Sequence, residues 1–139
     1  MTNLDKLAAE AAQQMVQDAP RAKAKKTYDT LENLVTKTLG VLQSQGVYAA
    51  MLFLFSRSGD EGKMAPLIRK NLYVLLRELQ NFKGDTELPN FNDETKAQTV
   101  LKWYSKWVLD NFDTLLLIRD LYEQTLIYAR YGAKAAKGE

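Results

Sequence analysis

The sequence has no cysteine and no histidine among its 139 residues. Without cysteine the chain has no disulfide, no thiolate nucleophile, and no zinc or iron–sulfur site with cysteine ligands. Without histidine it also lacks the side chain that most often acts as a general base near neutral pH. Nucleases that depend on histidine, metal sites with histidine ligands and serine–histidine triads are therefore excluded. We expect no catalytic residue, no metal site and no cofactor.

Proline and glycine are also scarce, with 3 and 7 residues, and few stretches alternate between apolar and polar residues as strands do. The hydrophobic fraction of 46% and the charged fraction of 26% are ordinary for a globular protein. A chain of this length suits one domain with a core of its own. The sequence therefore predicts a single all-α domain over residues 1–139, a bundle of five to six helices.

Long hydrophobic runs are missing as well. No run of 18 apolar residues is present, so we expect no membrane-spanning helix. Residues 1–6 do not form a basic segment followed by an apolar one, so we expect no signal peptide. The absence of cysteine does not itself decide the compartment but fits a reducing cytoplasm, and we expect a cytoplasmic protein without a membrane partner. The net charge is only +2, so any binding of nucleic acid must come from local basic patches.

The most apolar stretch, residues 47–55, carries no charge. As a helix it would span about 14 Å, too little to cross a bilayer. A buried strand is the alternative, but residues 49–52 are strong helix formers and only Val47 is β-branched. A helix that is apolar on every side must be covered on every side. We therefore expect a short central helix with the other helices packed around it and with Leu52 and Leu54 both buried.

The remaining helices follow from apolar residues at helical spacing. Pro20 either starts a second helix or kinks a continuous one, and Gly46 ends the helix that follows it. Pro66 is expected in the first turn of the next helix, after a polar loop over residues 57–63. The longest irregular stretch is expected at residues 82–92. The other predicted helices lie at about residues 2–19, 21–45, 66–81, 93–109 and 114–137.

Basic residues gather at three places. One helix face carries Arg69, Tyr73 and Arg77 at four-residue intervals, with Lys70 beside them. Two guanidiniums that flank an aromatic ring are typical of surfaces that bind the phosphates and stack the bases of single-stranded nucleic acid. The alternative is an ordinary solvated face with Tyr73 half buried. The second place is the basic run that contains Arg21, Lys23, Lys25 and Lys26, and the third is the end of the last helix, with Arg130 and Lys134. Basic residues at such positions are also common simply as part of solvated helix ends.

Three stretches resemble one family, the small α-helical subunit of the type III-B CRISPR RNA-targeting effector, the Cmr complex. The first is a helix that ends at Gly46 and is followed by the apolar residues 47–54. The second is the alanine-rich first helix. The third is a last helix with tyrosine, threonine and leucine at set spacing before an Ala/Lys tail, here Tyr122, Thr125, Leu126 and residues 133–135. The similarity covers most of the chain in helix order and departs from the family pattern at Pro20 and over residues 82–92.

The resemblance implies a non-catalytic subunit that stacks in a few copies along the effector. Its implied partners are the other effector subunits, further copies of itself in head-to-tail contact, the target RNA and the guide RNA. We expect Arg69, Lys70 and Arg77 to contact the RNA backbone, with the other six basic residues as secondary contacts. Three alternatives stay open: the small subunit of the type III-A (Csm) effector, a helical adaptor that contacts only protein, and an enzyme of unknown type, against which the missing histidine and cysteine argue.

Overall fold

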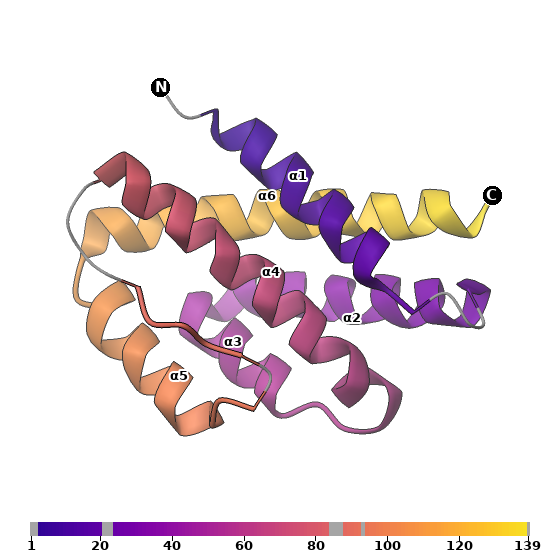
Figure 1. Cartoon of the computed structure of the whole chain (residues 1–139), viewed down its shortest axis with the longest axis horizontal. Helices are drawn as coiled ribbons and strands as arrows, with labels where there is room; N and C mark the ends of the chain where they lie inside the picture. Colours follow the sequence, from indigo (N-terminus) through magenta and orange to yellow (C-terminus); the bar gives the residue numbers. More distant parts are fainter. Residues whose placement is uncertain (1–2, 21–23, 84–87, 93, 139) are drawn as a thin grey trace.

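The computed structural model describes residues 3–20, 24–83, 88–92 and 94–138. These ranges contain six α-helices, one π-helical segment and no strand, which confirms the predicted all-α bundle (Figure 1). None of the helices in these ranges is both long and apolar enough to cross a membrane. The elements are α1 (Leu4–Asp18), α2 (Ala24–Gln45), α3 (Val47–Phe55), α4 (Gly59–Lys83), α5 (Ala97–Trp103), η1 (Tyr104–Val108) and α6 (Phe112–Lys137).

The two most extensive helix–helix contacts of the bundle both involve α6. Helices α2 and α6 lie side by side and run in opposite directions (Figure 1). At one end the ammonium group of Lys137 lies 2.7 Å from Asp29 Oδ1, and at the other the guanidinium of Arg119 donates a hydrogen bond to the Gln43 carbonyl at 3.1 Å. Helix α1 packs on α6 and α4, and α4 also packs on α2 and α3. The long helices therefore enclose one core to which each contributes its apolar face.

The short apolar helix α3 is packed on only part of its circumference. Val47, Ala50, Met51 and Leu54 are buried, but Leu52 is 47% exposed. The expectation that this helix is covered on every side, with Leu52 inside, is wrong. On its outer side arginines take the place of a covering helix. The guanidinium carbon of Arg57 lies 3.9 Å from the centre of the Phe53 ring, and that of Arg69 lies 4.0 Å from the centre of the Phe55 ring.

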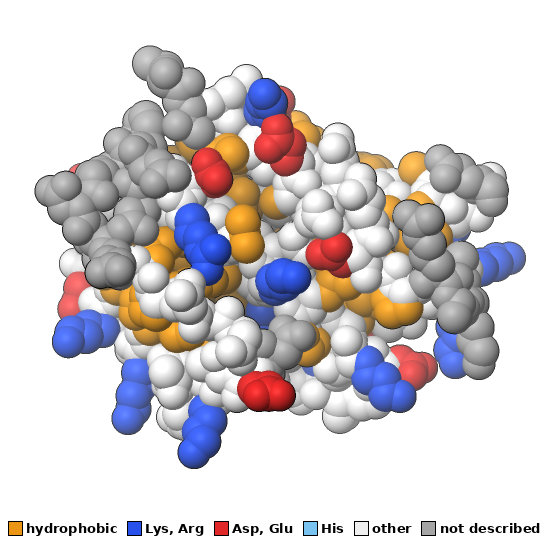
Figure 2. All heavy atoms as spheres, in the orientation of Figure 1, with side chains coloured by type: hydrophobic (Ala, Val, Ile, Leu, Met, Phe, Trp, Pro, Cys, Tyr) orange, Lys and Arg blue, Asp and Glu red, His pale blue; other side chains and the backbone are white. Residues whose placement is uncertain are grey.

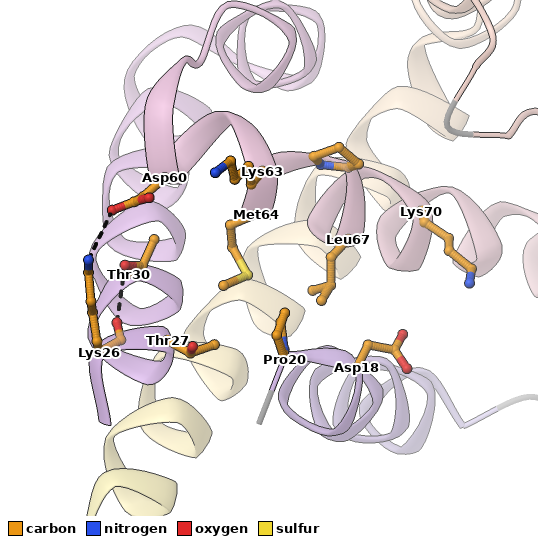
Figure 3. Close-up of a pocket in the computed structure, with 11 residues that line it drawn as sticks. Asp18, Pro20, Lys26, Thr27, Thr30, Asp60, Lys63, Met64, Leu67 and Lys70 are labelled. Carbon is orange, nitrogen blue, oxygen red and sulfur yellow. Dashed lines mark hydrogen bonds and ion pairs between the residues drawn. The ribbon is translucent and has the colours of Figure 1, made fainter. Parts of the chain in front are cut away.

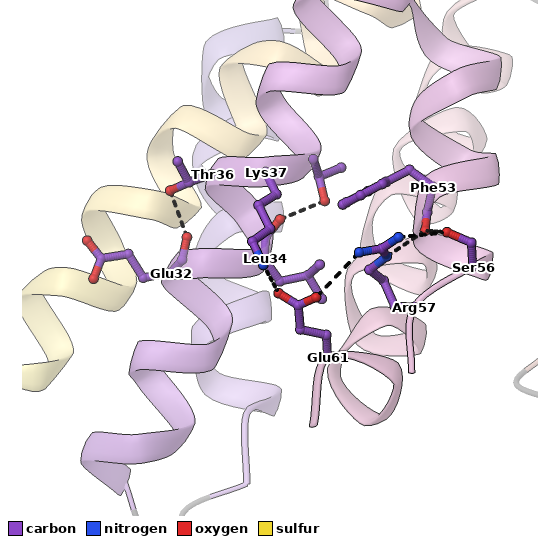
Figure 4. A network of polar contacts seen from close by, with 9 residues as sticks. Glu32, Leu34, Thr36, Lys37, Phe53, Ser56, Arg57 and Glu61 are labelled. Atoms are coloured by element: carbon purple, nitrogen blue, oxygen red, sulfur yellow. Dashed lines mark hydrogen bonds and ion pairs between the residues drawn. The ribbon is translucent and has the colours of Figure 1, made fainter. Parts of the chain in front are cut away.

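The connection from α3 to α4 is shorter than predicted. Most of the expected loop over residues 57–63 is helical, because α4 begins at Gly59, and Pro66 lies inside α4 rather than in its first turn. Glu61 stabilises this early start: its carboxylate lies 2.7 Å from the ammonium of Lys37 and 3.6 Å from the guanidinium of Arg57 (Figure 4). A carboxylate in the first turn also interacts favourably with the helix dipole. These contacts fix the corner between α2, α3 and α4.

The predicted fifth helix is divided in two. Helix α5 ends at Trp103, and the chain continues as the π-helical segment η1, in which the Leu109 amide donates to the Tyr104 carbonyl at 3.2 Å. The Tyr104 side chain is completely buried, and its hydroxyl oxygen lies 2.6 Å from that of Tyr122 on α6, which is also completely buried. A polar pair of this kind is tolerated in a core because each hydroxyl has a partner.

We expect the fold to lose stability steeply above pH 10. Burial raises the pKa of Tyr104 and Tyr122 well above the usual 10.0, and it raises the pKa of Tyr73 to about 12. The folded chain therefore keeps these protons at a pH where the unfolded chain releases them. It follows that the full contribution to stability is present below pH 10 and is lost as the pH rises toward 12, by about 1.4 kcal/mol per pH unit for each tyrosine.

The measurement is denaturant unfolding at a series of pH values from neutral to strongly alkaline. The matched variant is the double substitution Tyr104→Phe and Tyr122→Phe, which removes both hydroxyls together and so leaves neither unpaired. This variant is expected to show a clearly shallower loss of stability above pH 10. An identical pH dependence for the variant and the parent chain would contradict the assignment of the alkaline loss to this pair.

Candidate nucleic-acid interface

Two hollows lie along α4 and share the side chains of Pro66 and Lys70. The larger has a volume of about 580 Å³ and lies between α1, α2 and α4 (Figure 3). The smaller has a volume of about 270 Å³ and lies between α3, α4, α5 and the segment at residues 88–92. Because the two hollows share lining residues, they form neighbouring depressions along one side of α4.

The larger hollow, here called the mixed-charge hollow, carries both signs of charge. Lys63 and Lys70 line it from α4, and Lys26 lines it from α2 (Figure 3). The ammonium of Lys26 pairs with the Asp60 carboxylate at 3.7 Å. A second carboxylate, that of Asp18, also lines the hollow. The opposite charges largely offset one another, so this hollow attracts a polyanion only weakly.

The smaller hollow, here called the aromatic hollow, is lined by Phe55, Tyr73 and Phe91 and by three cations. The cations are Arg69, Lys70 and Arg77, which are the residues expected to contact RNA, and no acidic residue is among the lining residues that the structure describes. The structure therefore brings the three principal candidates together around one depression. In Figure 2, Lys and Arg side chains lie along the course of α4 on the face shown.

The charges of Lys70 and Arg77 are available to a ligand. Both side chains are exposed, and neither lies within ion-pair distance of a described carboxylate. Arg77 donates a hydrogen bond to Asn90 Oδ1 at 3.1 Å, which is a neutral acceptor. Arg69 differs, since it is half buried and its guanidinium lies against the Phe55 ring. Lys70 and Arg77 are thus the pair best placed to hold phosphates.

Tyr73 does not present its ring to solvent. The side chain is only 6% exposed. The prediction of an exposed stacking ring is therefore wrong, and so is the alternative prediction of a half-buried ring. Its ring centre lies 4.8 Å from that of Phe91 and 5.5 Å from that of Trp103, and its hydroxyl donates to the Pro89 carbonyl at 2.5 Å. The physical reason is that residues 88–92 fold over this part of α4. Tyr73 therefore positions Phe91 as a wall of the aromatic hollow.

The secondary basic residues are distributed over other surfaces. Lys25 and Lys26 are exposed in the first turn of α2; Lys26 lines the mixed-charge hollow, and Lys25 lines neither of the two hollows along α4. Arg21 and Lys23 lie outside the described residues. Arg130 and Lys134 are exposed on α6 and line neither of the two hollows along α4. A role for Arg130 and Lys134 in RNA binding stays a prediction.

Three lining residues that carry charge or a flat ring are not among the binding residues predicted from the sequence: Phe55, Lys63 and Phe91. A signal for Lys63 was present, because Lys63, Lys70 and Arg77 recur every seven residues, or about two helical turns, and so lie on one stripe of α4. Phe55 belongs to the apolar stretch that the sequence predicts to be buried, and no charged residue in that stretch indicates a side exposed to solvent. Phe91 had no usable signal, because its place depends on how an irregular segment packs on a helix distant in the sequence.

Comparison with known proteins gives no match: no protein-family model, no curated protein and no solved structure matches this chain. Within the described ranges, no group of three or more acidic residues is arranged to hold a metal ion. The arrangement of side chains itself is therefore the basis for a functional interpretation. It offers cations and flat apolar surfaces, which suit binding of a polyanion that carries aromatic bases.

Proposed function

We propose that this chain is a non-catalytic subunit that contacts RNA in a cytoplasmic CRISPR type III-B ribonucleoprotein effector. The observation that supports RNA contact is the gathering of Arg69, Lys70 and Arg77 around the aromatic hollow, without a described acidic residue in its lining. Phosphate contacts position an RNA without reading its sequence. A subunit that serves changing guides requires that property. The assignment to this effector type rests on the resemblance of the helix order and the apolar stretch.

In this proposal the chain also contacts further copies of itself, head to tail, and the other effector subunits. Exposed apolar side chains support contacts with protein. Leu52 is 47% exposed on α3, whereas Phe112 and Leu116 are 70% and 45% exposed at the start of α6. A contact between two different patches does not close on itself and can be repeated along a linear RNA. The type III-A effector and a protein-only adaptor are the alternatives.

We expect the double substitution Lys70→Ala and Arg77→Ala to weaken binding to single-stranded RNA equally for unrelated sequences. Each lost phosphate contact lowers the slope of log affinity against log salt concentration by about 0.7, so the double variant should lose about 1.4. The measurement is the affinity of the full chain for unstructured RNAs across a salt series. Arg69 is left unchanged, because its removal would also uncover Phe55.

The matched control is the double substitution Arg130→Ala and Lys134→Ala, which removes the same charge from exposed positions outside the hollows. We expect a clearly smaller change for this pair. Equal losses for the two pairs would mean that the face on α4 contributes no more than these predicted secondary contacts, and would reject it as the principal RNA surface. A parent chain that binds no RNA even at low salt would favour the adaptor.

A further inference from the structure

The aromatic hollow has flat walls on two elements. Phe55 comes from α3 and Phe91 from the segment at residues 88–92, and both are half buried. The guanidinium of Arg69 lies 4.0 Å from the centre of the Phe55 ring and covers one face of that ring. Nucleobases in RNA complexes stack on surfaces of these two kinds, aromatic rings and guanidinium planes.

The size of the hollow limits what fits. Pockets for drug-sized ligands have volumes of about 300–1,000 Å³. The aromatic hollow, at about 270 Å³, lies just below that range and suits one planar ring system rather than a larger ligand. Lys70 and Arg77 line the same hollow with exposed charged groups, where the phosphates on either side of such a ring would pass.

The segment that carries Phe91 is held in place before any ligand arrives. The Tyr73 hydroxyl donates to the Pro89 carbonyl at 2.5 Å, and Arg77 donates to Asn90 Oδ1 at 3.1 Å. The Asn92 amide donates to Thr95 Oγ1 at 2.9 Å. Two residues before Phe91 and one after it are thus tied to α4 or to the following turn. A wall formed in advance lowers the ordering cost of binding.

We propose that the aromatic hollow takes one unpaired nucleobase of the RNA while Lys70 and Arg77 hold the adjacent phosphates. This inference rests on the proposed RNA binding and adds to it that the bases, and not only the phosphates, contribute to affinity. The stacking surfaces accept any base, because every base has a π-face. The face therefore binds RNA with accessible bases more tightly than an equally charged backbone without bases.

The experiment compares two short oligomers of equal length and charge, an oligouridine and a chain of abasic spacers, for binding to the full chain at a fixed salt concentration. Stacking of one base on an aromatic side chain predicts a preference for oligouridine of about 5- to 150-fold. The substitution Phe91→Leu keeps an apolar side chain in the wall but removes its flat ring. It should reduce the preference several-fold and leave the salt slope unchanged. Phe112→Leu, at a phenylalanine that is 70% exposed outside the hollow, is the control and should change neither quantity.

The possible results distinguish the nucleobase site from the RNA binding on which it rests. Equal affinity of the parent chain for the two oligomers, with a steep salt slope, would overturn the base site and leave phosphate binding standing. No binding of either oligomer would overturn both. An unchanged preference in the Phe91→Leu variant would show that the bases are held elsewhere. The comparison in the parent chain decides the matter even if that variant does not fold.

Discussion

Replacement of Leu54 by Asp is expected to abolish the folded state, whereas the same replacement at Leu52 is expected to leave the chain folded. Leu54 is 1% exposed and packs in the core, and Leu52 is 47% exposed on the same helix, α3. A carboxylate without a partner at the buried position costs several kcal/mol. That cost is comparable to the whole stability of a typical domain, about 5–15 kcal/mol. At the exposed position the carboxylate stays in water.

The measurement is circular dichroism during thermal unfolding of the two variants, made in parallel with the parent chain. The pair is well matched, because the two positions are two residues apart and undergo the same chemical change. A cooperative transition in the Leu52→Asp variant and none in the Leu54→Asp variant is the expected result. If both variants were unfolded, α3 would be enclosed on every side, as its composition alone suggests. If both melted cooperatively, α3 would not belong to the core.

The sequence predicted the helical class correctly but could not predict which side of α3 faces solvent. Periodic placement of polar residues normally marks the outer face of a helix. Residues 47–55 have no charged residue, so their outer face carries no mark. The structure covers Phe53 and Phe55 with guanidiniums, and Arg69, which covers Phe55, lies fourteen residues further along the chain. A pairing of this kind depends on tertiary packing, which the local pattern does not contain.

The candidate site likewise has one part that the sequence predicts and one part that it does not. Helical spacing on α4 correctly places Arg69 and Arg77 on a common face with Lys70 beside them. The sequence does not predict the burial of Tyr73, because the cover comes from residues 88–92, an irregular segment whose path cannot be inferred from periodicity. Local sequence therefore locates the cations, whereas the aromatic walls depend on contacts between separate parts of the chain.

The start of α4 also differs from the sequence prediction, for a different reason. A proline is favoured in the first turn of a helix, so the sequence predicts that this helix starts close to Pro66. The helix instead begins at Gly59, because the Glu61 carboxylate pairs with Lys37 and Arg57 and so stabilises an additional segment. The tight corner that results brings Gly62 close to the backbone of Arg57. A side chain at position 62 would therefore meet that backbone.

Substitution of Gly62 by alanine is expected to destabilise the fold, although both residues are compatible with a helix. A Cβ atom at position 62 would lie 2.9 Å from the Arg57 carbonyl oxygen and 3.2 Å from its carbonyl carbon. Arg57 cannot move away easily, because its side chain pairs with Glu61 and donates to the Phe53 carbonyl at 3.2 Å. Crowding of this kind typically costs about 1–3 kcal/mol.

The matched control is Gly40→Ala in α2, where an added Cβ atom would meet nothing within 4 Å. Alanine is more favourable than glycine inside a helix by about 1 kcal/mol, so this variant should be more stable than the parent chain. Urea unfolding of the three proteins should therefore give midpoints in the order Gly40→Ala, parent and Gly62→Ala, from highest to lowest. A Gly62→Ala midpoint at or above that of the parent chain would show that the corner yields to a methyl group. In that case the ion pairs of Glu61 would not be what keeps the first turn of α4 close to the backbone of Arg57.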